Sequence, residues 1–578
     1  MADVLYTNTT NRIQTRGGVL VAPGETRVVD DRFPEQASYD AYQTVQALLA
    51  IDALSDADVI AMHDASALMT EKKATLQQIA NYVRGIEAEN NIGTPGAQGF
   101  GVGICPQEVL GMSRMSGTTD IASNNYGNYQ YSDGSVMCWI PAFFYKIGTG
   151  SNGLAVNVVD IKPRYAYATV EEANTAGYAL HRAFYDGTEQ PGFFVDKYEW
   201  SNNSGIASSI ALGNPLSSVA THNGWGSLLS GLTTGDNIHE GAIKAAKTRG
   251  NNFFCGSLPI YSALALLSLA HGQAATSTTH CAWFLVNKNY PKGNNNNALK
   301  DADDLTTTFT SDGYLNCAKT GSGSPFAKTT HNGQNCGVAD LNGNLWEVAI
   351  GLTCIAANKT ITGATQGNPC AITAAVHGYT TGAIVMIASV VGMTQLNDRL
   401  YTITVTGANT FTLNGVDSSG YAAYSSGGTA TTGLFYAAKP TKQMKDFTSG
   451  NTLVTSHWGA SGVAEMMSSL TVNLETNAAS NAVGQRFGSG ANQTLSESTN
   501  GDYWTQTGFM LPKINGTSNS GTQLFGADYF YQCFRNELCP VVGGAWADGA
   551  GAGVWGLNLS YSRAYSYASV GARAGLYL

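Results

Sequence analysis

The sequence predicts a multidomain α+β protein, and three observations lead to this class. A chain of 578 residues is long enough for roughly three or four domains. Short β-rich runs with glycine turns open the chain, and a stretch with apolar residues at three- and four-residue steps follows. Runs of β-branched residues return in the second half. Strand and helix patterns thus occupy separate stretches, which is typical of α+β proteins.

The first 136 residues predict three small units. Residues 1–35 carry short strand patterns and predict a β attachment unit, too short to be stable alone. Residues 36–92 carry a helical pattern that predicts an oligomerisation segment, although a monomeric helical hairpin agrees equally well with the periodicity. Residues 93–136 predict a Gly/Pro-rich connector followed by a β segment.

The main domain is expected to occupy residues 137–354 and to resume at residues 436–578. In its first part, residues 138–147 and 193–200 predict strands, because both runs are rich in aromatic and aliphatic side chains. Further along, residues 242–249 predict a short helix, and a longer helix is expected from Leu258 through His271.

Residues 355–435 predict an all-β module inserted into this domain. The runs 383–387 and 401–405 are rich in β-branched residues, and glycine-containing turns separate them. The segment resembles small β modules that are common in phage tail fibres. Because surface loops accept insertions where their chain ends lie close together, we expect the module to sit on such a loop.

Three ordered motifs resemble those of the C-type-lectin-like fold. They are GFFVDKYE at 192–199, ADLNGNLWE at 339–347 and the closing segment from GGAW at 543 to Arg573. The resemblance is to formylglycine-generating enzymes and to the variable proteins of diversity-generating retroelements, including the phage tropism determinant. It implies a lectin-like fold for the main domain. The catalytic cysteines of the enzyme family have no counterpart after GGAW, so the resemblance argues against oxidase activity.

Trp346, Glu347, Arg563 and Arg573 are expected to be structural residues of these motifs. Glu347, beside Trp346 in the motif, is expected to be a buried and hydrogen-bonded carboxylate. Arg563 and Arg573 are expected to hold the terminal loop through bidentate hydrogen bonds.

Composition and residue spacing exclude several functions. The net charge of −10, with 12% charged residues, leaves no basic surface for nucleic acid. The ten cysteines form no CxxC pair and the nine histidines show no metal-binding spacing, so we expect no cofactor and no metal. Asp301 and Asp303 begin like a calcium loop, but Thr306 and Asp312 replace its glycine and glutamate, which favours a solvated loop.

The sequence also shows no recognisable targeting signal. No signal peptide is recognisable, so we expect mostly free thiols after folding in a reducing cytoplasm. No run of about 18 apolar residues exists, so we expect no membrane insertion.

The last 36 residues predict a binding surface. Gly, Ala, Ser, Tyr and Trp fill 26 of these positions, a composition typical of paratopes. An ordinary Gly/Ala-rich terminal strand and loop is the structural alternative. In retroelement-diversified relatives the varied positions cluster in the segment that matches 546–569. We therefore expect exposed receptor-binding residues at Trp546, Asp548, Ala550, Ala552, Trp555, Ser560, Tyr561, Ala564, Tyr565, Tyr567 and Ser569.

These features together predict a phage receptor-binding protein without catalytic activity. It would form a homotrimer at the tail tip or tail fibre of the virion, contact tail or baseplate proteins, and adsorb to a host-cell surface receptor, either protein or glycan. The helical segment motivates the trimer, and the terminal segment motivates the receptor site. Two alternatives are a tail-associated polysaccharide-degrading enzyme, which needs a pair of carboxylates, and a purely structural tail fibre.

Overall fold

The computed structural model describes residues 4–7, 14–16, 19–21, 26–29, 90–285, 288–447, 463–476, 484–488, 494–495, 501–513 and 524–578. The chain divides into two compact units, Met1–Glu89 and Asn90–Leu578. The described residues form several sheets and few helices, so the prediction of an α+β multidomain protein is confirmed at that level.

The first unit contains two antiparallel strand pairs. Strand β1 (Val4–Thr7) pairs with β4 (Thr26–Val29), and β2 (Gln14–Arg16) pairs with β3 (Val19–Val21). The expected helical segment 36–92 lies outside the described residues as far as residue 89, and residues 90–92 are not helical.

The second unit is built on two six-stranded sheets. The first has the order β16-β31-β13-β7-β6-β5 and is antiparallel throughout, so the end of the chain pairs with strands from its first half. The second sheet has the order β26-β27-β29-β28-β17-β30. The first sheet comprises β5 (Met112–Arg114), β6 (Asn128–Tyr131), β7 (Val136–Pro141), β13 (Gly192–Asp196), β16 (Phe254–Cys255) and β31 (Ala574–Leu576), and the second comprises β17 (Trp346–Val348), β26 (Gly484–Arg486), β27 (Tyr529–Tyr531), β28 (Val541–Gly543), β29 (Gly553–Asn558) and β30 (Val570–Gly571).

The strand expected at 138–147 is split at Ala142. Residues before the break form β7, whereas those after it form β8 (Phe143–Ile147), which pairs with β9 (Val159–Pro163) and β10 (Ala179–Leu180) in a separate sheet. The proline at position 141 has no N–H for a ladder, and the Ala142 N–H donates to the carbonyl of Pro191. Two strand pairs complete this region: β11 (Tyr185–Asp186) with β12 (Thr188–Glu189), and β14 (Ser201–Asn203) with β15 (Ile206–Ser208).

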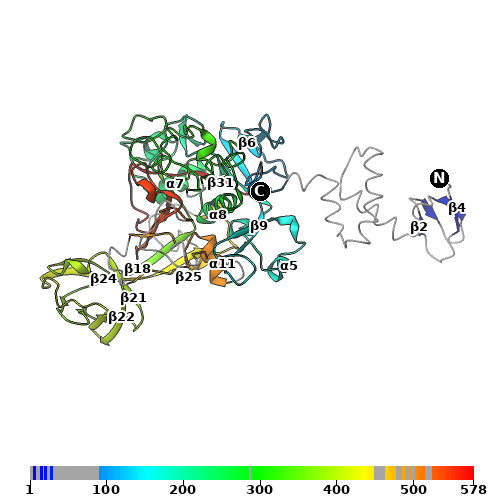
Figure 1. The fold of residues 1–578 in the computed structure, drawn as a ribbon. Coiled ribbons are helices and arrows are strands. Elements are labelled where there is room, and N and C mark those ends of the chain that lie inside the picture. The colour runs from blue at the N-terminus through cyan, green and yellow to red at the C-terminus, as the bar shows by residue number, and fades with distance from the viewer. Residues whose placement is uncertain are drawn as a thin grey trace. The chain divides into compact units, whose positions relative to one another are not determined.

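Helix α8 (Leu258–Ala274) lies at the centre of the second unit (Figure 1). Residues 258–272 are all buried, because the helix is apolar on every side. Helix α7 (Ile238–Lys247) is amphipathic instead, and the Asn237 side chain caps it. No helix among the described residues is long and apolar enough to cross a membrane. The remaining helical elements are α5 (Val170–Thr175), α6 (Trp225–Leu228), α10 (Val463–Met466), α11 (Gly501–Gly508), η1 (Arg164–Ala166), η2 (Arg182–Phe184), η3 (Phe326–Thr329), η4 (Thr394–Leu396), η5 (Met444–Asp446) and η6 (Gly549–Gly551).

A β module extends from this unit on a two-stranded ribbon (Figure 1). The ribbon strands β18 (Leu352–Thr360) and β24 (Ser426–Ala438) pair from Leu352 with Ala437 to Thr360 with Thr429. Residues of the module, among them Ile372, Ile387 and Phe411, form a hydrophobic cluster of their own. The other strands are β19 (Gly363–Ala364), β20 (Ala371–Thr373), β21 (Ile384–Val391), β22 (Arg399–Gly407) and β23 (Thr410–Leu413), while β25 (Met467–Leu470) pairs with β24 near the main body.

Candidate functional site

A buried ion pair occupies the position of the ADLNGNLWE motif. Arg573 donates from Nε to Glu347 Oε2 over 2.5 Å and from Nη2 to Oε1 over 2.6 Å. The Tyr261 hydroxyl donates to the same carboxylate. Trp346 and Glu347 begin strand β17, so this pair ties the second sheet to the end of the chain. Every carboxylate oxygen has a donor, which is what a buried charge requires.

A chain of polar contacts leads from this motif toward a second buried group. Asn344 Nδ2 donates to Glu199 Oε2 over 2.6 Å. Asn344 Oδ1 accepts from the Ala318 N–H over 2.8 Å and from Cys317 Sγ over 3.6 Å. Burial raises the pKa of Glu199 well above its ordinary value, and the carboxylates of Asp340 and Glu347 add to the shift.

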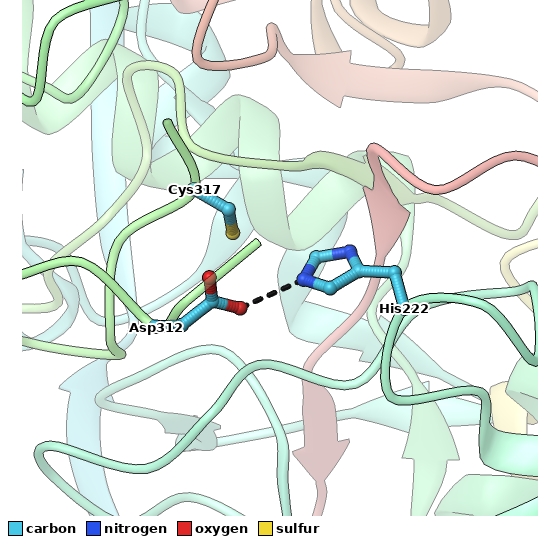
Figure 2. A group of neighbouring side chains, drawn as sticks. All are labelled: His222, Asp312 and Cys317. Carbon is cyan, nitrogen blue, oxygen red and sulfur yellow. Dashed lines mark hydrogen bonds and ion pairs between the residues drawn. The ribbon is translucent and has the colours of Figure 1, made fainter. Parts of the chain in front are cut away.

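This series of polar contacts ends at a cluster of three side chains, His222, Asp312 and Cys317 (Figure 2). Their donor atoms all lie within 4.8 Å of one another. His222 Nε2 is 2.7 Å from Asp312 Oδ2, and both side chains are almost fully buried, with exposures of 1% and 0%. On the other side of the ring, His222 Nδ1 is 2.6 Å from the carbonyl oxygen of Ala568.

Aromatic rings enclose the histidine. The Tyr314 ring stacks on the imidazole with 4.1 Å between centroids, and the Trp546 ring meets it edge-on at 5.9 Å. The Tyr314 backbone N–H donates to Asp312 Oδ1 over 2.7 Å, which leaves Oδ2 directed at His222. We call His222, Asp312 and Cys317 the triad.

The imidazole of His222 pairs with Asp312, since its Nε2 lies 2.7 Å from Asp312 Oδ2. A cysteine nucleophile activated by histidine needs the imidazole hydrogen-bonded to the sulfur, so this pairing does not favour one. Burial raises the pKa of Cys317 well above its ordinary value, and Asp312 and then Glu199 raise it further. The sulfur is therefore a thiol in this environment. Both ring nitrogens of His222 face an oxygen atom, Asp312 Oδ2 on one side and the Ala568 carbonyl on the other.

Sequence reasoning did not find the triad. His222 is 90 positions from Asp312, and Cys317 follows five positions later, so the three residues form no motif. Asp312 was considered only as the last position of a calcium loop. Asp312 and Cys317 lie in one loop, closed by the bond from the Asp312 N–H to the Cys317 carbonyl, and tertiary folding brings His222 to this loop.

The predicted receptor-binding residues do not share one exposed surface. Trp546, Ala552, Trp555 and Ser569 are buried, which contradicts their expected exposure. Trp555, for example, stacks on Phe487 in the core. Partly or fully exposed positions are Asp548, Ala550, Ser560, Tyr561, Ala564, Tyr565 and Tyr567. Binding through these residues stays a prediction.

The tyrosines of the terminal segment are arranged by a turn rather than a strand. In an extended strand, Tyr561, Tyr565 and Tyr567 would point to the same side as Arg563. Instead residues 559–569 form turns and one isolated bridge, with Arg563 buried. The rings of Tyr561 and Tyr565 stack with 4.2 Å between centroids, and Tyr567 follows at 6.0 Å.

The polar loop expected at 287–304 is not solvated around Asp301. This side chain is buried and accepts N–H bonds from Gly293, Asp303 and Asp304. Asn295 donates to it as well. The carboxylate therefore organises the loop from inside, and burial raises its pKa.

Comparison with known families identifies one match, which lies in the β module. Residues 370–433 match the family model of the ubiquitin-activating enzyme E1 FCCH domain. No curated protein matches the sequence. The match begins at Cys370 and ends within β24, so it covers the module and none of the main body.

This match contradicts the phage interpretation of the sequence. The matched family is a domain of a cellular enzyme, and not a tail-fibre or lectin-like family. The prediction of a receptor-binding tail protein without catalysis is therefore wrong. The predicted homotrimer with tail proteins and a host receptor as partners is wrong as well, and so is the predicted place in the virion. The expected resemblance of the module to the β modules of tail fibres is also wrong, because the module matches the FCCH domain family. Glu347 and Arg573 form the buried bidentate pair expected of them, and this pair belongs to the internal packing of the fold rather than to a receptor site.

Proposed function

We propose that this chain is an enzyme-associated protein whose β module, residues 361–433, binds a protein partner in ubiquitin-type protein modification. The observation that carries the proposal is the match of residues 370–433 to the FCCH domain of ubiquitin-activating enzyme. The matched residues coincide with the segment that has its own hydrophobic cluster.

The way the module is attached supports a docking role. In β21, Val385 and Ile387 point into the module's cluster, and Met386 between them belongs to the cluster of the main body. Met386 Sδ lies 3.5 Å from Cys533 Sγ. The module thus contacts the body through one face of its sheet near the ribbon, and its far turns remain open to a partner.

The surface chemistry of the module favours a partner with a neutral, partly apolar surface. Only Asp398, Arg399 and Asp417 carry charge between residues 361 and 433. Val376 is 73% exposed, and its φ of 44° is a strained conformation for a β-branched residue. The Asn409 side chain holds it by accepting its N–H over 2.7 Å. Strained, exposed residues of this kind concentrate at binding sites.

The proposal includes a finer division of the fold. We infer that residues 93–354 and 436–578 belong to one body, and that the module is inserted between them. The pairing of Thr360 with Thr429 supports this inference, because it brings the two ends of the insertion together.

A deletion tests the proposal. Removing residues 361–428 and joining Thr360 to Thr429 through Asn-Gly should close the ribbon as a hairpin, since this dipeptide favours the required turn. We expect the shortened chain to keep its folded body, measured by circular dichroism. Calorimetric titration with ubiquitin as the probe should show binding to the full chain and none to the shortened one.

A point variant refines this test. Val376→Ser should weaken ubiquitin binding by roughly tenfold, about the effect of removing a buried apolar contact. Ile121→Ser is the matched control, because Ile121 is a half-exposed residue of the main body. If the full chain does not bind ubiquitin, or the shortened chain binds it equally well, the proposed function fails.

A further inference from the structure

We propose that His222, Asp312 and Cys317 bind a zinc ion next to the terminal segment, whose Ala568 carbonyl contacts the His222 ring. This site is independent of the β module and of the proposed partner binding. It is argued from the donor atoms, their outer hydrogen bonds and their burial.

The triad offers the donor set that zinc prefers. Nitrogen from histidine, oxygen from aspartate and sulfur from cysteine are its usual protein ligands, and a thiolate favours zinc over magnesium or calcium. Figure 2 shows the Cys317 sulfur and the Asp312 carboxylate, which come from one loop, facing the His222 ring from another loop. These residues supply three of the four ligands of a tetrahedral site.

The spacing of the donors fits a tetrahedral ion after small side-chain movements. With zinc bonds of about 2.0–2.3 Å, ligand atoms in a tetrahedral site are about 3.3–3.6 Å apart. The His222 Nε2 to Asp312 Oδ2 distance of 2.7 Å is shorter, and the largest separation in the triad is within 4.8 Å. Side-chain rotations that lengthen the His222–Asp312 distance and shorten the largest separation would make room for the ion.

The outer hydrogen bonds already orient two of the ligands. His222 Nδ1 donates to the Ala568 carbonyl, which directs Nε2 toward the site. A metal-binding histidine usually donates its other N–H to such a carbonyl. The Tyr314 N–H fixes the other aspartate oxygen, Oδ1. These contacts hold the two ligands in the orientation that a metal ion needs. An ion pair without a metal would not need them.

The electrostatic surroundings also favour a cation. The Asp312 side chain and the Cys317 side chain are both buried, and their ligand atoms lie within 4.8 Å of each other. Zinc binding would convert the Cys317 thiol to a thiolate, and the thiol proton would be released to solvent. The rings of Tyr314 and Trp546 pack against His222 at this site.

Cobalt titration tests the proposal. The full chain is reduced, stripped with a chelator and titrated with Co²⁺, a spectroscopic substitute for zinc. We expect saturation at one equivalent, a sulfur-to-cobalt charge-transfer band and the visible bands of a tetrahedral site. Zinc should displace the cobalt, and the apparent affinity should rise with pH because binding releases protons.

Variants locate the ion. Cys317→Ser should abolish the charge-transfer band. His222→Ala removes a ligand, so it should weaken cobalt binding by more than the roughly 10- to 100-fold that is typical of losing a hydrogen bond to a ligand. Cys281→Ser is the control, because Cys281 is equally buried and lies outside the triad. The proposal is overturned if the unaltered chain binds no cobalt, a measurement that does not depend on any variant folding. It is also overturned if folded Cys317→Ser keeps the charge-transfer band.

Discussion

Buried histidines outside the triad show how single residues couple this fold to pH. His331 is fully buried, its Nδ1 accepts the Val338 N–H over 3.0 Å, and its Nε2 is 3.1 Å from the Gly101 carbonyl oxygen. Burial is the main cause that lowers its pKa to about 3. Burial likewise lowers the pKa of His181 to about 3 and that of His271 to about 4. All three are therefore neutral in the folded chain at pH values where the unfolded chain protonates them.

The expected consequence is a loss of stability in acid. An unfolded histidine has a pKa of about 6.5, so the contribution of neutral His331 is complete above that value and falls as the pH drops toward 3. The loss is about 1.4 kcal/mol per pH unit for each such residue. His331→Asn should be less stable at pH 7.5, and its deficit relative to the unaltered chain should shrink between pH 6.5 and 4.5 in urea unfolding.

The comparison with the variant is needed because several buried carboxyl groups, Asp186 and Asp340 among them, change stability with pH in the opposite sense. Burial raises the pKa of Asp186 and Asp340 to about 6, so their contribution is lost as the pH rises through 6. Both are present in each protein and cancel in the difference. A deficit that stays constant across the pH range would show that His331 is protonated in the fold.

Helices α7 and α8 differ in what keeps them folded. The all-apolar α8 is fixed by burial on every side, so its ends matter little. The amphipathic α7 depends more on local signals: Asn237 Oδ1 accepts the Glu240 N–H over 3.0 Å, and Lys244 and Lys247 occupy the last turn. The sequence predicted both helices, with α7 beginning four residues earlier than expected. That start was missed because the capping residue lies before the apolar periodicity begins.

Removing the cap should destabilise α7 measurably. Asn237→Ala deletes the acceptor for the Glu240 N–H and should lower the free energy of unfolding by about 1 kcal/mol. Asn237→Ser, the matched control, keeps an acceptor and should recover most of the loss. Thermal melting compares the three proteins, and equal melting temperatures would mean that tertiary contacts alone hold this turn.

The cysteine thiols of this protein are buried in its interior. All ten cysteines are free and buried, and burial is the first cause that raises the pKa of each, to about 11 for Cys105 and about 12 for Cys138 and Cys539. Neutral, inaccessible thiols react slowly because the thiolate is the nucleophile.

Thiol titration under native conditions should therefore show almost no reaction. We expect fewer than about one thiol per chain to react with an aromatic disulfide reagent within minutes at pH 8, and all ten after unfolding. Rapid reaction of one native thiol would identify a site that opens in solution and would contradict the closed packing.

The sequence by itself determined the local features of this protein. Apolar runs and β-branched runs predicted helix α8 and strands β21 and β22, because these patterns depend on periodicity within a few turns or strand residues. The match of residues 370–433 to a domain family lies within the expected insertion.

Tertiary structure alone decided the site and the surface. The triad joins loops 90 residues apart, and no spacing rule relates them. The chain turn at 559–569 buries Arg563 while stacking the tyrosines, so alternation along an extended strand gave the wrong exposure. Asp301, polar in sequence, is buried because nearby N–H groups supply its hydrogen bonds. Periodicity reports which face of an element is apolar, but burial of a polar group depends on partners that only the folded chain brings near.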